Sequence, residues 1–276
     1  MDALLAAYGV WALSCLQEIY TALGDSAGAS RVASIHGQAV IDFNTAFWNA
    51  GNRSYHDWID VQGKARSYYF VDVAFVAIIA GIANATQATA LLDHYDSRLA
   101  DIYTEYDVTP GTIWSAPCNL YLISDPKEFA NDVHAPVAFP SYENGGSFFH
   151  TPGLQFSALG VAGRPDAAYD GFVALLNSGF GRIRGWAQQL YWSPNRQPER
   201  LVGGDPLNTA ALSIWGFMRT SFGAAPTLTR GVVAVNKPAA AAMGSRWNVS
   251  VLGENVCLVV GDGVTTFCNG SALQPL

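Results

Sequence analysis

The chain has 276 residues, of which half are apolar and 13% are charged, and its formal net charge is −7. This length allows one large domain, or one domain with a small appendage, and the apolar content is ample for a packed core. The small number of basic residues argues against a protein that binds the nucleic-acid backbone. Aromatic residues make up 12% of the sequence. Many of them stand beside Gly, Asn or Asp, which favours a sugar-like ligand over a charged one; the alternative is that they are ordinary aromatic residues of the core.

The first 23 residues are apolar, but they include Asp2 and Glu18 and have no basic start. Helical spacing places one broad apolar face along them, made of Leu4, Leu5, Tyr8, Trp11, Ala12, Cys15, Leu16 and Ile19. The segment is therefore predicted to be a core helix, and neither a signal peptide nor a membrane span. Other apolar runs are too short to cross a bilayer, so no membrane partner is expected. Four Asn-x-Ser/Thr sequons favour a secreted protein whose signal is not in this chain.

Apolar periodicity and capping residues predict seven helices. They span residues 3–23, 26–47, 69–83, 86–103, 151–161, 166–178 and 205–220. Short turns join the first two, the next two and the fifth with the sixth, which predicts antiparallel helix hairpins. Long polar segments separate these pairs, and loops of such length in a compact domain are usually functional.

After Pro226 the pattern changes to short runs rich in β-branched residues, at 231–235, 247–252, 256–260 and 264–267. Glycine and proline turns separate them, which predicts a small antiparallel β-sheet. The chain is thus divided into a helical domain, residues 1–225, and a β module, residues 226–276. Cys257 and Cys268 flank a turn within this module, and a hairpin disulfide between them is plausible.

The stretch FPSYENGGSFFHTPGLQFSALG, residues 139–160, gathers chemically useful side chains before a helix. It carries a carboxylate, an amide, a Gly-Gly pair, two aromatics and a histidine. Glycines there allow the backbone to approach a ligand closely. The alternative is that these polar groups only cap the helix.

This stretch, the RGW and Tyr-Trp loop that follows it and the helix in GGDPLNTAALSIWGF together resemble the six-hairpin glycosidases, which are (α/α)6 toroids. The resemblance covers about residues 3–223. It implies a mainly α fold, namely a partial α/α toroid of antiparallel hairpins followed by the β module. A whole toroid has about twelve helices, so early hairpins are expected in an N-terminal segment or a partner. In many relatives the general acid lies on a loop just ahead of a helix similar to residues 3–23. The resemblance therefore implies that the general acid of this protein lies upstream of Met1.

In the phosphorylase branch of that superfamily, a Tyr-x-Asn-Gly-Gly element followed by an aromatic and a His-Thr pair is similar to residues 142–151 here. The resemblance implies that His150 and the helix start at Asn208 and Thr209 face the attacking group.

Inverting hydrolysis of a glycosidic bond needs a carboxylic acid and a carboxylate on opposite faces of the bond. Glu143, in its glycine-flexed loop beside aromatic side chains, is the first candidate. Asp57 and Asp60 bracket Trp58 in a polar loop, and one of them is the candidate partner. The alternatives are that Glu143 binds sugar hydroxyls or backbone and that the two aspartates cap their loop through Asx turns.

Loop aromatics offer flat faces to sugar rings, and amides, guanidinium and hydroxyl groups bind sugar hydroxyls. For Arg184 the alternative is an ion pair with Asp205 or Asp170. Trp192 is a further loop aromatic. The candidate substrate-binding residues are Trp58, Trp114, Tyr142, Asn144, Phe148, His150, Arg184, Trp186, Asp205, Asn208 and Thr209. No histidine pair has the spacing of a metal site on a helix, so neither a metal nor a cofactor is expected.

The sequence therefore predicts an inverting glycoside hydrolase acting on an oligosaccharide or polysaccharide. Two alternatives stay open. One is a phosphorylase of the same fold, in which phosphate replaces the activated water. The other is a carbohydrate-binding toroid without catalysis.

Overall fold

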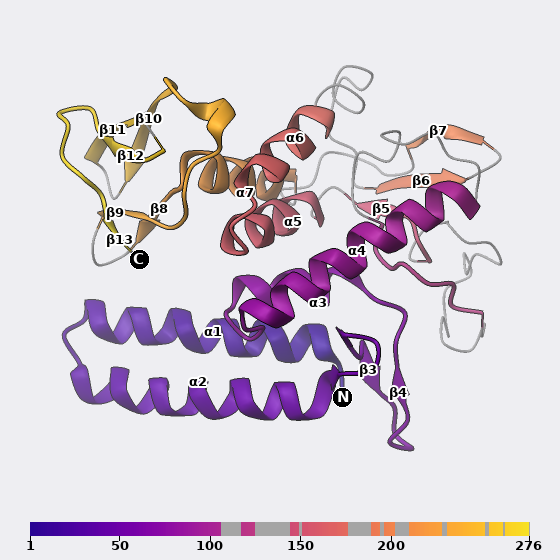
Figure 1. Cartoon of the computed structure of the whole chain (residues 1–276). Helices are drawn as coiled ribbons and strands as arrows, with labels where there is room; N and C mark the ends of the chain where they lie inside the picture. Colours follow the sequence, from indigo (N-terminus) through magenta and orange to yellow (C-terminus); the bar gives the residue numbers. More distant parts are fainter. Residues whose placement is uncertain are drawn as a thin grey trace.

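In the computed structural model the described residues are 1–105, 117–124, 144–148, 151–175, 189–193, 196–201, 210–227, 231–251, 254–261 and 263–275. Seven α-helices lie within these ranges and make the protein mainly α. Their bounds are α1 Ala3–Ala22, α2 Ser26–Phe47, α3 Val71–Ile79, α4 Ala85–Glu105, α5 Thr151–Val161, α6 Pro165–Leu175 and α7 Ala210–Phe222. Each of the seven predicted helices is present (Figure 1), with differences of a few residues at the ends.

Side-chain caps explain where several helices begin. The Asp2 carboxylate accepts a hydrogen bond from the Leu5 N–H at 2.8 Å, and Asp25 accepts one from the Gly28 N–H at 2.8 Å. Asn84 and Gln87 form a reciprocal capping box ahead of α4, with both hydrogen bonds at 3.0 Å. The third helix was predicted to start at Tyr69. Tyr69 has a φ of 54°, however, and therefore cannot belong to a right-handed helix.

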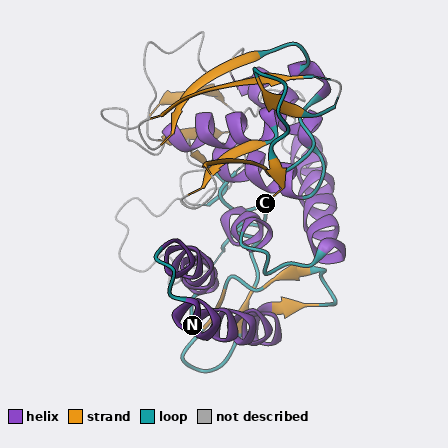
Figure 2. Ribbon diagram, turned by 90° about the vertical axis from the view of Figure 1, so that its left-hand side faces the viewer, coloured by secondary structure: helices purple, strands orange, loops and turns teal. Residues whose placement is uncertain are grey.

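The odd-numbered helices form one continuous row. Helix α1 contacts α3, α3 contacts α5, and α5 contacts α7, while α2 packs on α1, α4 on α3, and α6 on both α5 and α7. The central helix α3 is buried along nearly its whole length, and the main apolar core surrounds it. Figure 2 shows the α1–α2 pair at the lower edge of the molecule, next to short β-hairpins.

Short strands lie in the connections between helix pairs. Residues 48–66 form two small antiparallel hairpins that the sequence did not predict, β1 Trp48–Asn49 with β2 Ser54–Tyr55 and β3 Trp58–Ile59 with β4 Ala65–Arg66. Strand β5, Ser147–Phe148, pairs with β6, Gln189–Ser193, which pairs with β7, Arg196–Leu201. Phe148 and Trp192 were expected in loops and lie instead in β5 and β6.

The C-terminal module consists of two three-stranded sheets. The first contains β8 Ala224–Thr227, β9 Gly231–Ala234 and β13 Gln274–Pro275. The second contains β10 Arg246–Val251, β11 Glu254–Val260 and β12 Thr265–Phe267. The predicted antiparallel pairing is confirmed for β8 with β9 and for β10, β11 and β12, whereas the strands form two sheets and β13 pairs with β9 in parallel.

Cys257 and Cys268 are joined by the expected disulfide, with Cα atoms 5.4 Å apart. The module has its own small core around Leu258 and Leu273. A second cluster packs Val260 and the 3-10 helix η3, Ala240–Ala242, against Tyr169 of α6 and Phe222 of α7. The module is thus held on the last helices of the row.

The predicted core face of α1 was wrong. The buried residues of α1 are Ala3, Ala7 and Val10, whereas Leu5 is 74% exposed, and Tyr8 and Ile19 are also exposed. Ala3, Ala7 and Val10 belong to the main apolar core, with Leu4 and Trp11 partly buried against it, and the other large apolar side chains face outward. Among the described residues, α1 is the helix whose length and composition suffice to cross a membrane.

Candidate functional site

The connections between helices alternate between short and long along the chain. Turns 23–25, 80–84 and 162–164 are short and leave the C-terminal ends of α1, α3 and α5. Connections 48–70, 106–150 and 176–209 are long and lead into the N-terminal ends of α3, α5 and α7. In Figure 1 the N-terminus, β3 and β4 and strands β5 to β7 lie on one side of the molecule, and the C-terminal module lies on the other. The described strands of these connections therefore lie on the same side of the molecule as the N-terminus.

Three described segments of these connections are tied together by backbone hydrogen bonds. The Val71 N–H donates to the Cys118 carbonyl at 3.0 Å, and the Leu120 N–H donates to the Tyr68 carbonyl at 3.1 Å. The Cys118 N–H in turn donates to the Gly146 carbonyl at 2.7 Å. Residues 117–124 thus lie between the loop before α3 and the loop before α5.

Asn144 is the centre of this junction and is fully buried. Its side-chain oxygen accepts a hydrogen bond from the Ile123 N–H at 2.9 Å, and its side-chain nitrogen donates to the Ile123 carbonyl at 3.1 Å. The next residue, Gly145, donates its N–H to the Asn119 side-chain oxygen at 2.5 Å. The amide of Asn144 is therefore engaged inside the protein, where it fixes the backbone directly after Glu143.

Asp57 lies in the loop ahead of α3 and is only 4% exposed. Its carboxylate accepts hydrogen bonds from the backbone N–H of Phe70, at 2.8 Å, and of Tyr68. Burial raises the pKa of Asp57 to about 7, because the loss of hydration outweighs the backbone donors, which lower it. Asp57 therefore holds residues 68–70 in place and carries a proton near neutral pH.

Asp60 and Trp58 stand beside Asp57 on β3 and the turn that follows it. One Asp60 oxygen accepts hydrogen bonds from the N–H of Gln62, at 3.0 Å, and of Lys64, at 2.8 Å, and the other lies 3.2 Å from Arg66. The Lys64 N–H is the main reason that the pKa of Asp60 is lowered.

The partly exposed Trp58 ring lies 5.5 Å from the Tyr68 ring and 6.1 Å from the Phe70 ring. Trp58 is thus the aromatic group beside both aspartates.

The structure links four of the expected site residues in the connections before α3 and α5. Asp57, Trp58 and Asp60 lie together, and Asn144 is linked to them through residues 68–70 and 117–124. The backbone of Phe148 continues from Asn144 into β5. The remaining candidates lie outside the described residues: Glu143, Trp114, Tyr142, His150, Arg184, Trp186, Asp205, Asn208 and Thr209.

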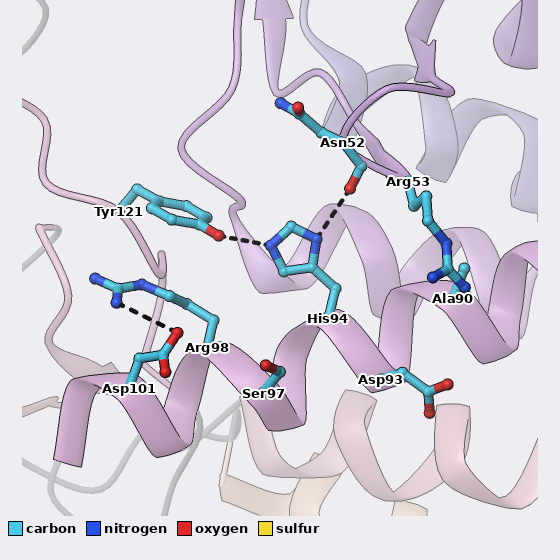
Figure 3. A pocket seen from close by; sticks show the side chains of 9 residues that line it. All are labelled: Asn52, Arg53, Ala90, Asp93, His94, Ser97, Arg98, Asp101 and Tyr121. Carbon is cyan, nitrogen blue, oxygen red and sulfur yellow. Dashed lines mark hydrogen bonds and ion pairs between the residues drawn. The ribbon is translucent and has the colours of Figure 1, made fainter. Parts of the chain in front are cut away.

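A polar pocket beside this junction was not predicted from the sequence. It has a volume of about 310 Å³ and lies on α4, against the β1–β2 turn and Tyr121 (Figure 3). The signal available in the sequence is the helical spacing of the lining residues on α4. The lining residues are Asn52, Arg53, Ala90, Asp93, His94, Ser97, Arg98, Asp101 and Tyr121. Within the described part of the chain, no group of three or more His, Cys, Asp or Glu side chains could hold a metal ion.

The fold is similar to that of a GH78 family rhamnosidase of Bacillus sp. GL1, with a TM-score of 0.60 and 14% sequence identity. The match covers 100% of this chain and 26% of the rhamnosidase, so this chain spans about a quarter of the length of that enzyme. At this identity the likeness concerns the fold. No protein-family model and no curated protein sequence matches the chain.

Proposed function

We propose that this chain is part of an inverting glycoside hydrolase that acts on an oligosaccharide or polysaccharide. The observation that carries the proposal is that the long connections all precede α3, α5 and α7, with their described strands β3 to β7 on one side of the molecule (Figure 1). The fold likeness to a glycoside hydrolase supports it. In this proposal the row of odd-numbered helices is the inner layer of an α/α toroid, and α2, α4 and α6 belong to the outer layer.

Glu143 is proposed as a catalytic carboxylate. It directly precedes Asn144, whose buried hydrogen bonds to Ile123 fix the backbone at that point. A catalytic carboxylate must be held at a set distance from the glycosidic oxygen, and a fixed neighbouring residue favours this. Asp57 and Asp60 are the proposed partner carboxylates, and Trp58 is the proposed surface for a sugar ring. The other proposed substrate-binding residues are Trp114, Tyr142, Phe148, His150, Arg184, Trp186, Asp205, Asn208 and Thr209.

A non-catalytic carbohydrate-binding protein is the second candidate, because the side chains of Asp57 and Asp60 already accept hydrogen bonds from backbone groups of the protein. Asp57 accepts hydrogen bonds from backbone N–H groups before α3, and Asp60 closes its own turn. If neither acts on a sugar, we propose that the second carboxylate comes from another part of the protein or from a partner.

The exposed apolar side of α1 is where such a segment or partner would pack. Helices α3 and α5 each contact a helix of the row on both sides, whereas α1 contacts α3 on one side. Leu5, Tyr8, Leu16, Ile19 and Leu23 are exposed on α1. A large exposed apolar surface of this kind is typical of an interaction site.

Hydrolysis of chromogenic aryl glycosides, with an α-L-rhamnoside among them, tests the proposal. We expect release of the aryl group by the wild type and a loss of roughly 100-fold or more in Glu143→Gln. Glu18→Gln, which removes a carboxylate on α1, is the matched control and should keep full activity. Turnover that requires inorganic phosphate would identify a phosphorylase instead. Sugar binding with no turnover, unchanged in Glu143→Gln, would favour the non-catalytic candidate.

A further inference from the structure

The pocket on α4 has walls that are held in place from three parts of the chain. His94, on α4, lies within hydrogen-bonding distance of the Asn52 carbonyl, at 3.1 Å from Nδ1, and of the Tyr121 hydroxyl, at 2.7 Å from Nε2. Figure 3 shows its imidazole between these two residues, with Ser97 and Asp101 further along the helix. One side chain therefore joins the β1–β2 turn, α4 and the segment 117–124 around a single hollow.

Strained backbone occurs at one lining residue of the pocket and at a residue packed behind its wall. Within the described residues, Arg53 and Tyr69 are the two non-glycine residues with positive φ, at 53° and 54°. Arg53 lines the pocket, and the Tyr69 ring packs against His94 with its centroid 4.7 Å away. Backbone strain persists where the surrounding structure enforces it, and it gathers at ligand sites. The positive φ angles of Arg53 and Tyr69 are therefore a second observation, separate from the pocket's shape, that points to a ligand site.

The charged groups of the lining are balanced. The lining contains two arginines, Arg53 and Arg98, and two aspartates, Asp93 and Asp101. Several of these charges also form ion pairs at the rim of the pocket. The Arg98 guanidinium lies 2.6 Å from Glu105 and 3.9 Å from Asp101. Asp93 lies 2.6 Å from Arg164. A pocket with no excess of either sign suits a neutral ligand better than an anion or a metal ion.

The lining also offers both hydrogen-bond donors and acceptors around an aromatic ring. The guanidinium of Arg53 and the side-chain amide of Asn52 donate, and the carboxylates of Asp93 and Asp101 accept. Tyr121 contributes a partly exposed ring. Neighbouring hydroxyl groups of a sugar both donate and accept, and their ring CH groups pack on aromatic faces.

We propose that this pocket binds one residue of a neutral sugar. Its volume of about 310 Å³ is at the lower end of small-molecule sites, which fits a single ring and not a longer oligosaccharide. The site is independent of the proposed hydrolase activity, since none of its lining residues has a role in that proposal.

Titration with methyl glycosides tests the site, and backbone amide NMR shifts report it. The probes are methyl α-L-rhamnopyranoside and methyl α-D-glucopyranoside, with glucuronate and inorganic phosphate as charged counterparts. We expect saturable shifts at Arg53, Ser97 and Tyr121 with a neutral glycoside at millimolar concentration, and weaker or no shifts with the charged probes.

Two variants and one control complete the test. Arg53→Gly removes the guanidinium and places a residue suited to positive φ, so it should fold normally. Asp101→Asn removes one acceptor charge. Each should weaken binding by about tenfold, whereas Asp42→Asn, the same change at an exposed position of α2, should leave it unchanged. Shifts with phosphate but not with neutral glycosides, no saturable shifts at all, or full binding in both variants would each overturn the proposal.

Discussion

Asp57 accepts a hydrogen bond from the Phe70 N–H at 2.8 Å, and its other oxygen accepts one from the Tyr68 N–H. Both carboxyl oxygens are therefore needed as acceptors. In Asp57→Asn the amide nitrogen cannot accept, so one buried N–H loses its partner. We expect a loss of roughly 1–3 kcal/mol in the free energy of unfolding at pH 5. Urea unfolding measures it, with the partly exposed Asp60→Asn as the control that loses less, because the Asn oxygen can still accept from Gln62 and Lys64. Equal stability of Asp57→Asn and wild type would contradict the role of Asp57 in holding this loop.

The same carboxyl group predicts a dependence of stability on pH. Burial raises the pKa of Asp57 from its ordinary 3.8 to about 7. Between these values the folded protein binds the proton more tightly than the unfolded chain. The stabilisation is thus full below about pH 4 and is lost as the pH rises through 7.

The measurement is the difference in unfolding free energy between wild type and Asp57→Asn from pH 4 to 8. The difference should be largest at acid pH and should shrink towards neutral pH. A difference that grows with pH would show that the folded protein prefers the ionised carboxylate.

The helices could be predicted from the sequence because their signals are local. Asp25 caps α2, and Asn84 with Gln87 caps α4, within three residues of the groups that they satisfy. The buried face of α1 could not be predicted in the same way. Leu5 and Val10 are both apolar, and the packing of α1 against α2 and α3, which lie elsewhere in the sequence, decides that Val10 is buried and Leu5 exposed.

The site was harder to predict because its contacts join distant parts of the chain. The partners of His94 lie 42 and 27 residues away, at Asn52 and Tyr121, so no local pattern in the sequence brings these residues together. Asn144 was expected to bind substrate, but its partner Ile123, which no local pattern indicates, engages its amide. For Asp60 the sequence already offered the Asx-turn alternative, because that interaction is local.

The disulfide between Cys257 and Cys268 joins β11 to the residue after β12 in the C-terminal module. Closing a loop of 11 residues restricts the unfolded chain, and we expect its loss to cost about 3 kcal/mol. Urea unfolding of the Cys257→Ser/Cys268→Ser double variant measures this cost. Cys15→Ser, at the exposed free cysteine of α1, is the control and should unfold as the wild type does. A double variant as stable as wild type would show that the strands alone hold the hairpin.

The close crossing of α5 and α7 gives a sharp test of the helix row. A Cβ atom at Gly216 of α7 would overlap the carbonyl oxygen of Gly153 and lie 3.0 Å from its carbonyl carbon in α5. Backbone atoms cannot move aside as a flexible side chain can, so Gly216→Ala should separate the two helices. We expect a net loss of about 2 kcal/mol in the free energy of unfolding, although alanine favours a helix.

The matched control is Gly9→Ala in α1, where a Cβ atom would meet nothing within 4 Å. There the helix preference of alanine acts alone, and we expect a gain of up to about 1 kcal/mol. Urea unfolding of both variants beside the wild type gives the two values. If Gly216→Ala gained stability as Gly9→Ala does, α5 and α7 would not cross at Gly153 and Gly216. The contact between α5 and α7, at the end of the helix row, would then be wrong.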